Sequence, residues 1–309
     1  MSTHPSAPLT DQSAAPRTVV AVDRRAQARE IARQLWAAGI IWPLALAFLW
    51  PLTFIKDVWL AQALSLLILL IVPGVLLLRA LRVPPRAVLA FPIYVPCASL
   101  VVLMGTGLTV NLIGISTGSD PPLRTGPMLA YVTVACVLML VLAPRQRDAF
   151  VPLLRRSVPR LHHLLPLTLP LLAAAGAAAV NAGSGAALAY AAVAAATVML
   201  CGAIVFADRI GAGTLAVILY SVALSLIWGY TLRGEFTYGF DITTEHLIAR
   251  EGIASGVWEL DHAEDAYGAL LSVTILPAFL SQVTGLSSLA IFKVVFPALF
   301  ALFPAGAFL

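Results

Sequence analysis

Long apolar runs are the feature of this sequence that most restricts its fold. Of its 309 residues, 60% are apolar and only 11% are charged, and the mean hydropathy is +0.93. A soluble domain carries charge on roughly 25% of its residues. A helix that crosses the hydrocarbon core of a membrane needs about 20 mostly apolar residues. The sequence therefore predicts an all-α protein, a polytopic transmembrane helical bundle.

About nine apolar runs are long enough to be considered as spans. They lie at Ala38–Ile55, Val58–Ala80, Val88–Ile113, Met128–Leu142, Leu164–Ala182, Ala186–Phe206, Ala212–Thr231, Ala269–Val283 and Leu289–Leu309. The fourth and eighth are short, and the eighth could instead lie partly in the membrane interface. The fifth and sixth are rich in alanine, which favours close helix packing. Pro73-Gly74 in the second run should kink or break that helix, with neighbouring groups satisfying the freed carbonyl.

Basic residues give the expected orientation. With residues 1–37 read as a cytoplasmic, disordered and basic tail, the predicted inner loops hold fourteen of the nineteen Lys and Arg residues. The predicted outer loops hold four, namely Lys56, Arg124, Arg233 and Arg250. An excess of Lys and Arg marks cytoplasmic loops. We therefore expect a multi-pass cell-membrane protein with membrane lipids around it and its loop 232–268 on the extracytoplasmic side. The net charge of +4 sits in these loops and does not indicate nucleic-acid binding.

The polar segment Gly234–Tyr267 is where chemistry is most expected. It contains eight of the fifteen acidic residues and two of the five histidines. Asp241 precedes a pattern typical of an amphipathic helix of about 13 residues, which we expect to end at Gly256 and to lie along the membrane surface. Asp is a favoured N-cap. If Asp241 is itself helical, both carboxylates face one side, and if it is only the cap, they still stay close. Their proximity would raise one pKa and leave a usable base. The alternative is that Asp241 is a cap and Glu245 a solvated neighbour.

Other polar residues of this region each have two interpretations. His246 could contact lipid phosphate or simply lie at the interface. Trp258 and Tyr267 fit interfacial anchoring by default and sugar stacking as the functional alternative. Lys293, inside the last apolar run, is either functional or reaches the nearby surface.

The acidic cluster after Trp258 has residue types that bind metals. It comprises Glu259, Asp261, His262, Glu264 and Asp265. No HExxH or EF-hand pattern is present. We therefore assign no metal site and no cofactor, and keep a divalent metal as an open alternative to a solvated loop.

Several motifs resemble one family of large prokaryotic multi-pass membrane proteins of unknown function, which is similar to GT-C glycosyltransferases. They are Y-G-F-D-I-T-T-E-H-L-I-A, then G-V-W, A-Y-G-A-L-L-S-V-T-I-L-P and I-F-K-V-V-F-P-A-L-F, and upstream V-P-G-V-L-L-L-R and L-M-G-T-G-L-T-V-N-L. The resemblance covers roughly residues 60–115 and 225–309. It implies N-terminal transmembrane helices at 38–211 and the start of a GT-C-like module at 212–309.

The resemblance also implies a function. In GT-C enzymes an acidic residue of the first extracytoplasmic loop faces a polyprenyl-phosphate-linked sugar and acts as a general base or helps to bind metal. Asp241 matches that position, and Glu245 is an accessory candidate. Arg250 and Arg233 are the local candidates for the departing phosphate. The sequence departs from the family pattern because Ile242, and no second acidic residue, follows Asp241.

Three functions are therefore weighed. The first is a membrane glycosyltransferase, or a fragment of one, acting on a lipid-linked sugar donor. The second is a non-catalytic scaffold with partner subunits in envelope polysaccharide assembly. The third is a transporter, which the scarcity of ionisable residues in the first seven spans disfavours. Because the sequence stops within an apolar run at Leu309, we expect the module to be truncated, with further helices needed to complete the donor site.

Overall fold

The computed structural model describes residues 41–83, 91–118, 121–143, 161–259 and 266–309, and in these ranges it contains helices and no strand. The all-α prediction is therefore confirmed. The elements are α2 (Ile41–Leu52), η1 (Thr53–Ile55), α3 (Trp59–Ala80), α4 (Phe91–Thr117), α5 (Thr125–Leu142), η2 (Leu161–Leu167), α7 (Thr168–Asn181), α8 (Ala187–Val205), η3 (Ala207–Arg209), α9 (Ala212–Thr231), α10 (Phe240–Ser255), α11 (Ile275–Thr284), α12 (Ser288–Ala290), η5 (Ile291–Val295), α13 (Phe296–Phe300) and α14 (Leu302–Phe308). The predicted tail 1–37 lies outside the described residues.

Within the described residues, seven helical segments are long and apolar enough to cross a membrane. They are Trp59–Ala80, Ile93–Thr117, Thr125–Leu142, Leu164–Asn181, Ala187–Val205, Ala212–Thr231 and Ser288–Phe308. Two further apolar helices, Ile41–Ile55 and Ile275–Thr284, are shorter. The structure thus supports a multi-pass, membrane-embedded protein, with seven membrane-length helices where nine spans were expected.

The eighth predicted span is the clearest difference from the expectation. In place of a helix over Ala269–Val283, the chain makes turns up to Thr274 and then forms α11, which has 10 residues. A helix of that length is about 15 Å long, half of the hydrocarbon core. Eight of its ten residues are buried, and it packs against α3, α4, α5 and α10. Its apolar composition therefore reflects burial inside protein.

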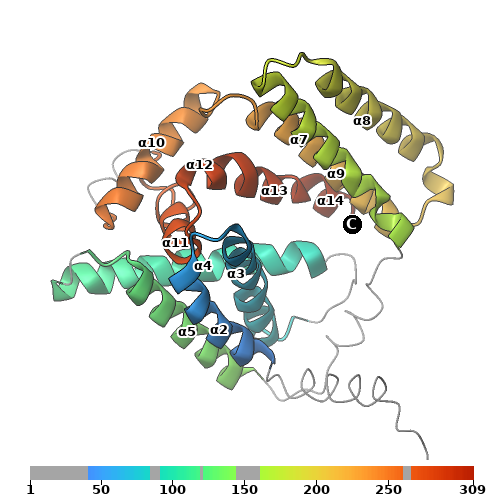
Figure 1. Cartoon of the computed structure of the whole chain (residues 1–309). Coiled ribbons are helices and arrows are strands. Elements are labelled where there is room, and N and C mark those ends of the chain that lie inside the picture. The colour runs from blue at the N-terminus through green and yellow to red at the C-terminus, as the bar shows by residue number, and fades with distance from the viewer. Residues whose placement is uncertain (1–40, 84–90, 119–120, 144–160, 260–265) are drawn as a thin grey trace, which may run out of the picture.

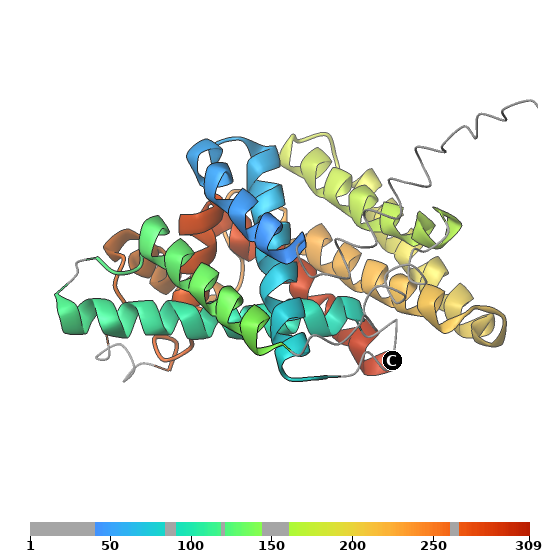
Figure 2. The same ribbon diagram turned by 90° about the horizontal axis from the view of Figure 1, so that it is seen from below.

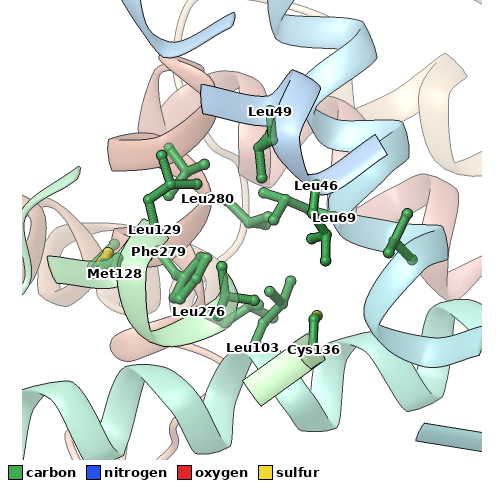
Figure 3. Close-up of a cluster of buried hydrophobic side chains, with 14 of the residues drawn as sticks. Leu46, Leu49, Leu69, Leu103, Met128, Leu129, Cys136, Leu276, Phe279 and Leu280 are labelled. Atoms are coloured by element: carbon green, nitrogen blue, oxygen red, sulfur yellow. The ribbon is translucent and has the colours of Figure 1, made fainter. Parts of the chain in front are cut away.

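The described helices form two packed groups (Figures 1 and 2). One group contains α2, α3, α4 and α5, and the other contains α7, α8 and α9. The last part of the chain joins them, because α11 packs in the first group while α13 and α14 lie against α9. The larger buried cluster combines side chains of α2, α3, α4, α5 and α11, with Phe279 fully buried among them (Figure 3).

Small residues bring the second group of helices together, as expected from their composition. A Cβ added to Gly176 of α7 would lie 2.8 Å from the backbone of Ala189 in α8. Ala173, Ala192 and Ala196 are also buried between these helices. The close backbone approach requires the absence of larger side chains, which fits the packing of small residues in membrane helices.

Pro73-Gly74 leaves α3 continuous from Trp59 to Ala80, so the expected break is absent. The Ser99 hydroxyl of α4 donates to the Leu70 carbonyl at 2.8 Å and accepts from the Gly74 N–H at 2.8 Å. A hydroxyl placed between these groups supplies partners that the proline-disturbed helix turn needs. A neighbouring helix thus supplies partners to backbone groups beside the proline, although the carbonyl that Pro73 itself frees is that of Leu69, next to the bonded Leu70.

Candidate functional site

The polar segment begins where α9 ends, and Asn181 at the end of α7 fixes its first residues. The Asn181 side-chain amide donates to the Leu232 carbonyl at 2.9 Å, and its oxygen accepts from the Gly234 N–H at 2.7 Å. Gly234 has a φ of +65°, a conformation that glycine adopts without strain. The chain can therefore turn sharply at the end of the span while its backbone groups remain paired.

Lys293 holds the same turn from the opposite side. Its side chain is 6% exposed, and its ammonium donates to the carbonyls of Arg233, Gly234 and Phe236 at 3.2, 2.7 and 3.2 Å. All three donors of the ammonium thus have acceptors. Neither sequence interpretation of Lys293 describes this contact, in which the side chain turns inward and ties the last membrane-length helix to the polar segment.

The helix around Lys293 explains why the contact is stable. Residues Ile291–Val295 form a π-helical turn that ends two residues before Pro297. Proline has no N–H for the carbonyl four residues earlier, which is that of Lys293. The Thr231 hydroxyl donates to this carbonyl at 3.1 Å, and the Trp228 indole N–H donates to the carbonyl of Val294 at 3.4 Å. The end of α9 thus satisfies the irregular turn that positions the lysine.

The predicted N-cap at Asp241 is wrong. The cap is Gly239, with φ +114° and ψ 143°, and Asp241 is in the first turn of α10. A side chain at position 239 would be strained in this conformation, whereas glycine adopts it readily. The Gly239 carbonyl accepts both the backbone N–H and the hydroxyl of Thr243, at 3.1 and 2.7 Å. The helix has 16 residues and, as predicted, ends at Gly256. The backbone of Gly256 is in the left-handed conformation.

The corrected start of α10 places Asp241 and Glu245 one helical turn apart on the same face. Asp241 is exposed and Glu245 is half-buried. Burial, and then the charge of Asp241, raise the pKa of Glu245 above its ordinary value. Of the two positions weighed for Asp241, helical or only the cap, the structure therefore has the helical one.

Tyr267 completes this carboxylate site. Its hydroxyl donates to Oδ1 of Asp241 at 2.8 Å, across 26 residues of sequence. Within the described part of the chain, Oδ2 of Asp241 has no hydrogen-bond partner. The tyrosine thus orients the carboxylate and leaves one oxygen open to an incoming group.

His246 lies on the side of α10 that faces the last membrane-length helix. Its Nε2 is 3.1 Å from the Ser288 hydroxyl oxygen, and its ring makes an edge contact with Phe292 at 5.3 Å between centroids. Burial, and then the charge of Arg250, lower the pKa of His246 below its ordinary value. The histidine therefore docks α10 on residues 288–292, whichever nitrogen carries the proton.

The lowered pKa of His246 predicts a pH dependence of stability. The unfolded chain binds the proton more readily, so stability contributed by neutral His246 is present above the unfolded pKa of about 6.5 and is lost as pH falls towards the folded pKa. Thermal unfolding measured from pH 7.5 to 5 should show this loss, and His246→Gln should reduce it. An unchanged pH profile in His246→Gln would contradict the assignment. The raised pKa of Glu245 changes stability with pH in the opposite direction, and it does so in both the wild type and His246→Gln.

Trp258 has a structural role that the sequence did not reveal. The buried side chain of Asn111 in α4 donates to the Trp258 carbonyl at 2.6 Å and accepts from its N–H at 2.8 Å. The indole N–H donates to the Gly268 carbonyl at 2.9 Å. These bonds fix the chain after α10 against the first helix group. Beside them, Glu251, Ser255, Trp258 and Glu259 line a cavity of about 150 Å³.

The two candidate arginines lie in different places. Arg250 is exposed on α10, one turn after His246, whereas the side chain of Arg233 lines a cavity between α7, α8 and α9. No hydrogen bond or ion pair joins either arginine to Asp241 or Glu245, all of which are described residues. The structure thus brings together Asp241, Glu245 and Tyr267, but it does not add the arginines to that group.

Most of the acidic cluster, residues 261–265, lies outside the described residues, and Glu259 at its start is exposed. Among the residues that the structure describes, no group of three or more His, Cys, Asp and Glu side chains could hold a metal ion.

Comparison with known proteins gave no relative from which a function could be transferred. No family model, no curated protein and no solved structure matches this chain. A function for this chain is therefore inferred from its own residues.

Proposed function

We propose that this protein is an integral membrane glycosyltransferase, or part of one, that transfers a sugar from a polyprenyl-phosphate-linked donor to an acceptor on the extracytoplasmic face. The observation that carries the proposal is the carboxylate of Asp241, oriented by Tyr267 in the first turn of α10. This carboxylate lies ten residues after the end of α9, a helix long enough to cross a membrane. A lipid-linked donor presents its reactive group at the membrane surface, where a residue just beyond the end of a membrane-spanning helix would lie.

In the proposed reaction, Asp241 takes the proton of an acceptor hydroxyl. The acceptor oxygen then forms a bond to the anomeric carbon, and the bond from that carbon to the lipid phosphate breaks with its electron pair left on the phosphate. A carboxylate with one oxygen held by a tyrosine and the other open has the arrangement that a positioned general base needs. Glu245, whose raised pKa favours the protonated form, is the candidate to receive or return a proton.

Arg250 is the proposed partner of the departing phosphate. Its guanidinium is exposed on α10, nine residues or about two and a half turns beyond Asp241, and is not engaged in an ion pair within the described residues. Because this spacing places Arg250 on the other side of the helix, its long side chain has to reach around α10 to meet a phosphate beside Asp241. Guanidinium groups bind phosphate oxygens through two parallel hydrogen bonds. His246 and Trp258, which were candidate substrate contacts, serve instead in this proposal to position α10 and the segment that follows it.

A non-catalytic scaffold is the second candidate, and the contacts of the polar segment favour it. Asn181 fixes this segment to α7, Asn111 fixes it to α4, and Lys293 and His246 both fix it to the last membrane-length helix. Such a network suits a rigid docking platform for partner subunits in envelope assembly as well as it suits an active site. Sugar transfer itself is the property that separates the two candidates.

The test is an assay of the full-length protein in membranes or nanodiscs with a panel of radiolabelled polyprenyl-phosphate sugars. We expect at least one donor to lose its sugar to a glycan or hydroxylated acceptor, with free polyprenyl phosphate as the second product. Membranes without the protein supply the background. Absence of donor consumption across the panel, from protein that remains folded and monodisperse, would favour the scaffold.

A further inference from the structure

The second helix group contains a lateral cavity of about 120 Å³ between α7, α8 and α9. Its walls are built from small side chains, Ala173 of α7, Ala189 and Ala192 of α8 and Gly229 of α9. Leu226 and Tyr230, at its edge, are 52% and 56% exposed on the outer surface of the group. The cavity is thus an apolar slot that opens sideways, in the direction from which a lipid chain would enter.

One charged residue lines the slot. Arg233, two residues beyond the end of α9, contributes its side chain, and its Nε is buried without a hydrogen-bond partner. Its guanidinium forms no ion pair within the described residues, although Glu235 is only two positions away. A buried donor without a partner is costly, and native proteins rarely leave one unsatisfied. A bound molecule that places a hydrogen-bond acceptor at this end of the slot would therefore satisfy the Arg233 side chain.

The dimensions of the slot match a lipid that lies in one leaflet. Ser225 marks its deepest point on α9, six residues before the helix ends at Thr231, which is a depth of about 9 Å. That depth fits within half of a hydrocarbon core of about 30 Å. Apolar cavities of this kind stay free of water and accept apolar groups. Acyl methylenes can fill the alanine-lined part while a phosphate reaches Arg233.

We infer that this slot binds an anionic bilayer phospholipid, with one acyl chain between α7, α8 and α9 and the phosphate on Arg233. The inference is independent of the proposed sugar transfer, because the residues that line the slot do not include Asp241, Glu245 or Tyr267. Binding would join α8 to the end of α9 and so support the turn that Asn181 and Lys293 hold.

Native mass spectrometry of the full chain, extracted from phosphatidylglycerol-containing nanodiscs, tests the inference. The wild type should retain one phosphatidylglycerol and should discriminate against phosphatidylcholine. Arg233→Gln should lower the retained fraction about tenfold, since it removes a charge-assisted hydrogen bond. Gly229→Leu should do the same by filling the slot. A Cβ at Gly229 lies 3.9 Å from the nearest side chain, so this substitution adds bulk without a backbone clash.

Arg124→Gln is the matched control, because it removes one exposed arginine that lies outside the slot, at the start of α5. It should retain phosphatidylglycerol as the wild type does. Equal retention of phosphatidylglycerol by Arg233→Gln and wild type would overturn the inference, as would equal retention of phosphatidylcholine. Selective retention of polyprenyl phosphate over phosphatidylglycerol would also overturn it and would assign the slot to a lipid-linked substrate.

Discussion

Replacement of Asp241 by Asn should lower sugar transfer by about 10²–10⁴-fold, the usual contribution of a positioned general base. The amide keeps the size of the carboxylate, and its oxygen can still accept the Tyr267 hydrogen bond, which is 2.8 Å long in the structure. The substitution removes the ability to accept a proton, together with one negative charge. The measurement is the initial rate of donor consumption in nanodiscs, compared at saturating donor so that a change in donor binding does not enter.

Glu251→Gln is the control for the loss of one negative charge on α10. Glu251 is exposed near the opposite end of the same helix and lies outside the proposed reaction. Its substitution should leave the rate as in the wild type. Tyr267→Phe should lower the rate less than Asp241→Asn, because it removes only the group that orients the base. A wild-type rate in folded Asp241→Asn protein would eliminate Asp241 as the base while leaving other enzymatic mechanisms open.

The membrane character of the chain could be predicted because it depends on composition over windows of about 20 residues. The error at Ala269–Val283 shows the limit of that signal. An apolar run has the same composition whether lipid or protein surrounds it, and α11 is surrounded by α3, α4, α5 and α10. The length of the run was the one indication that it does not cross the membrane. It contains only 15 residues, whereas a span needs about 20.

The candidate site was predictable in its location but only partly in its contacts. A polar segment between apolar runs identified Asp241 and Glu245, and their spacing indicated a shared helix face. The bond from Tyr267 depends on a chain reversal that no local pattern specifies. The cap at Gly239 was missed because Asp is the more frequent cap, whereas the glycine two residues earlier offered a backbone conformation that Asp would adopt only with strain.

Three contacts could not be predicted because they join residues far apart in the sequence. Asn111 and Trp258 are separated by 147 positions, Asn181 and Gly234 by 53, and Lys293 and Gly234 by 59. A polar residue inside an apolar run signals that it has a partner, since an unpaired one would be costly. The run itself does not reveal that the partner is backbone at the edge of the polar segment.

Lys293→Met should be the most destabilising single substitution considered, at about 3 kcal/mol. Among the described residues, Lys293 is the only side-chain donor to three carbonyls of the turn after α9. Each buried acceptor left unpaired costs about 1–3 kcal/mol, and access of water to the turn offsets part of the sum. Met keeps the length and the apolar stem of the side chain. In detergent, the midpoint of thermal unfolding should fall by about 5–10 °C.

Lys56→Met provides the matched control, because Lys56 is the other lysine of the chain and its side chain makes no hydrogen bond or ion pair with the part of the chain that the structure describes. Its unfolding midpoint should stay at the wild-type value. Limited proteolysis after Glu235 supplies a local readout, since release of the turn should accelerate cleavage there in Lys293→Met below its unfolding midpoint. Equal midpoints and equal cleavage rates for Lys293→Met and Lys56→Met would show that the turn is held by Asn181 alone. The earlier interpretation of Lys293 as a functional charge within a membrane-length helix would then be preferred.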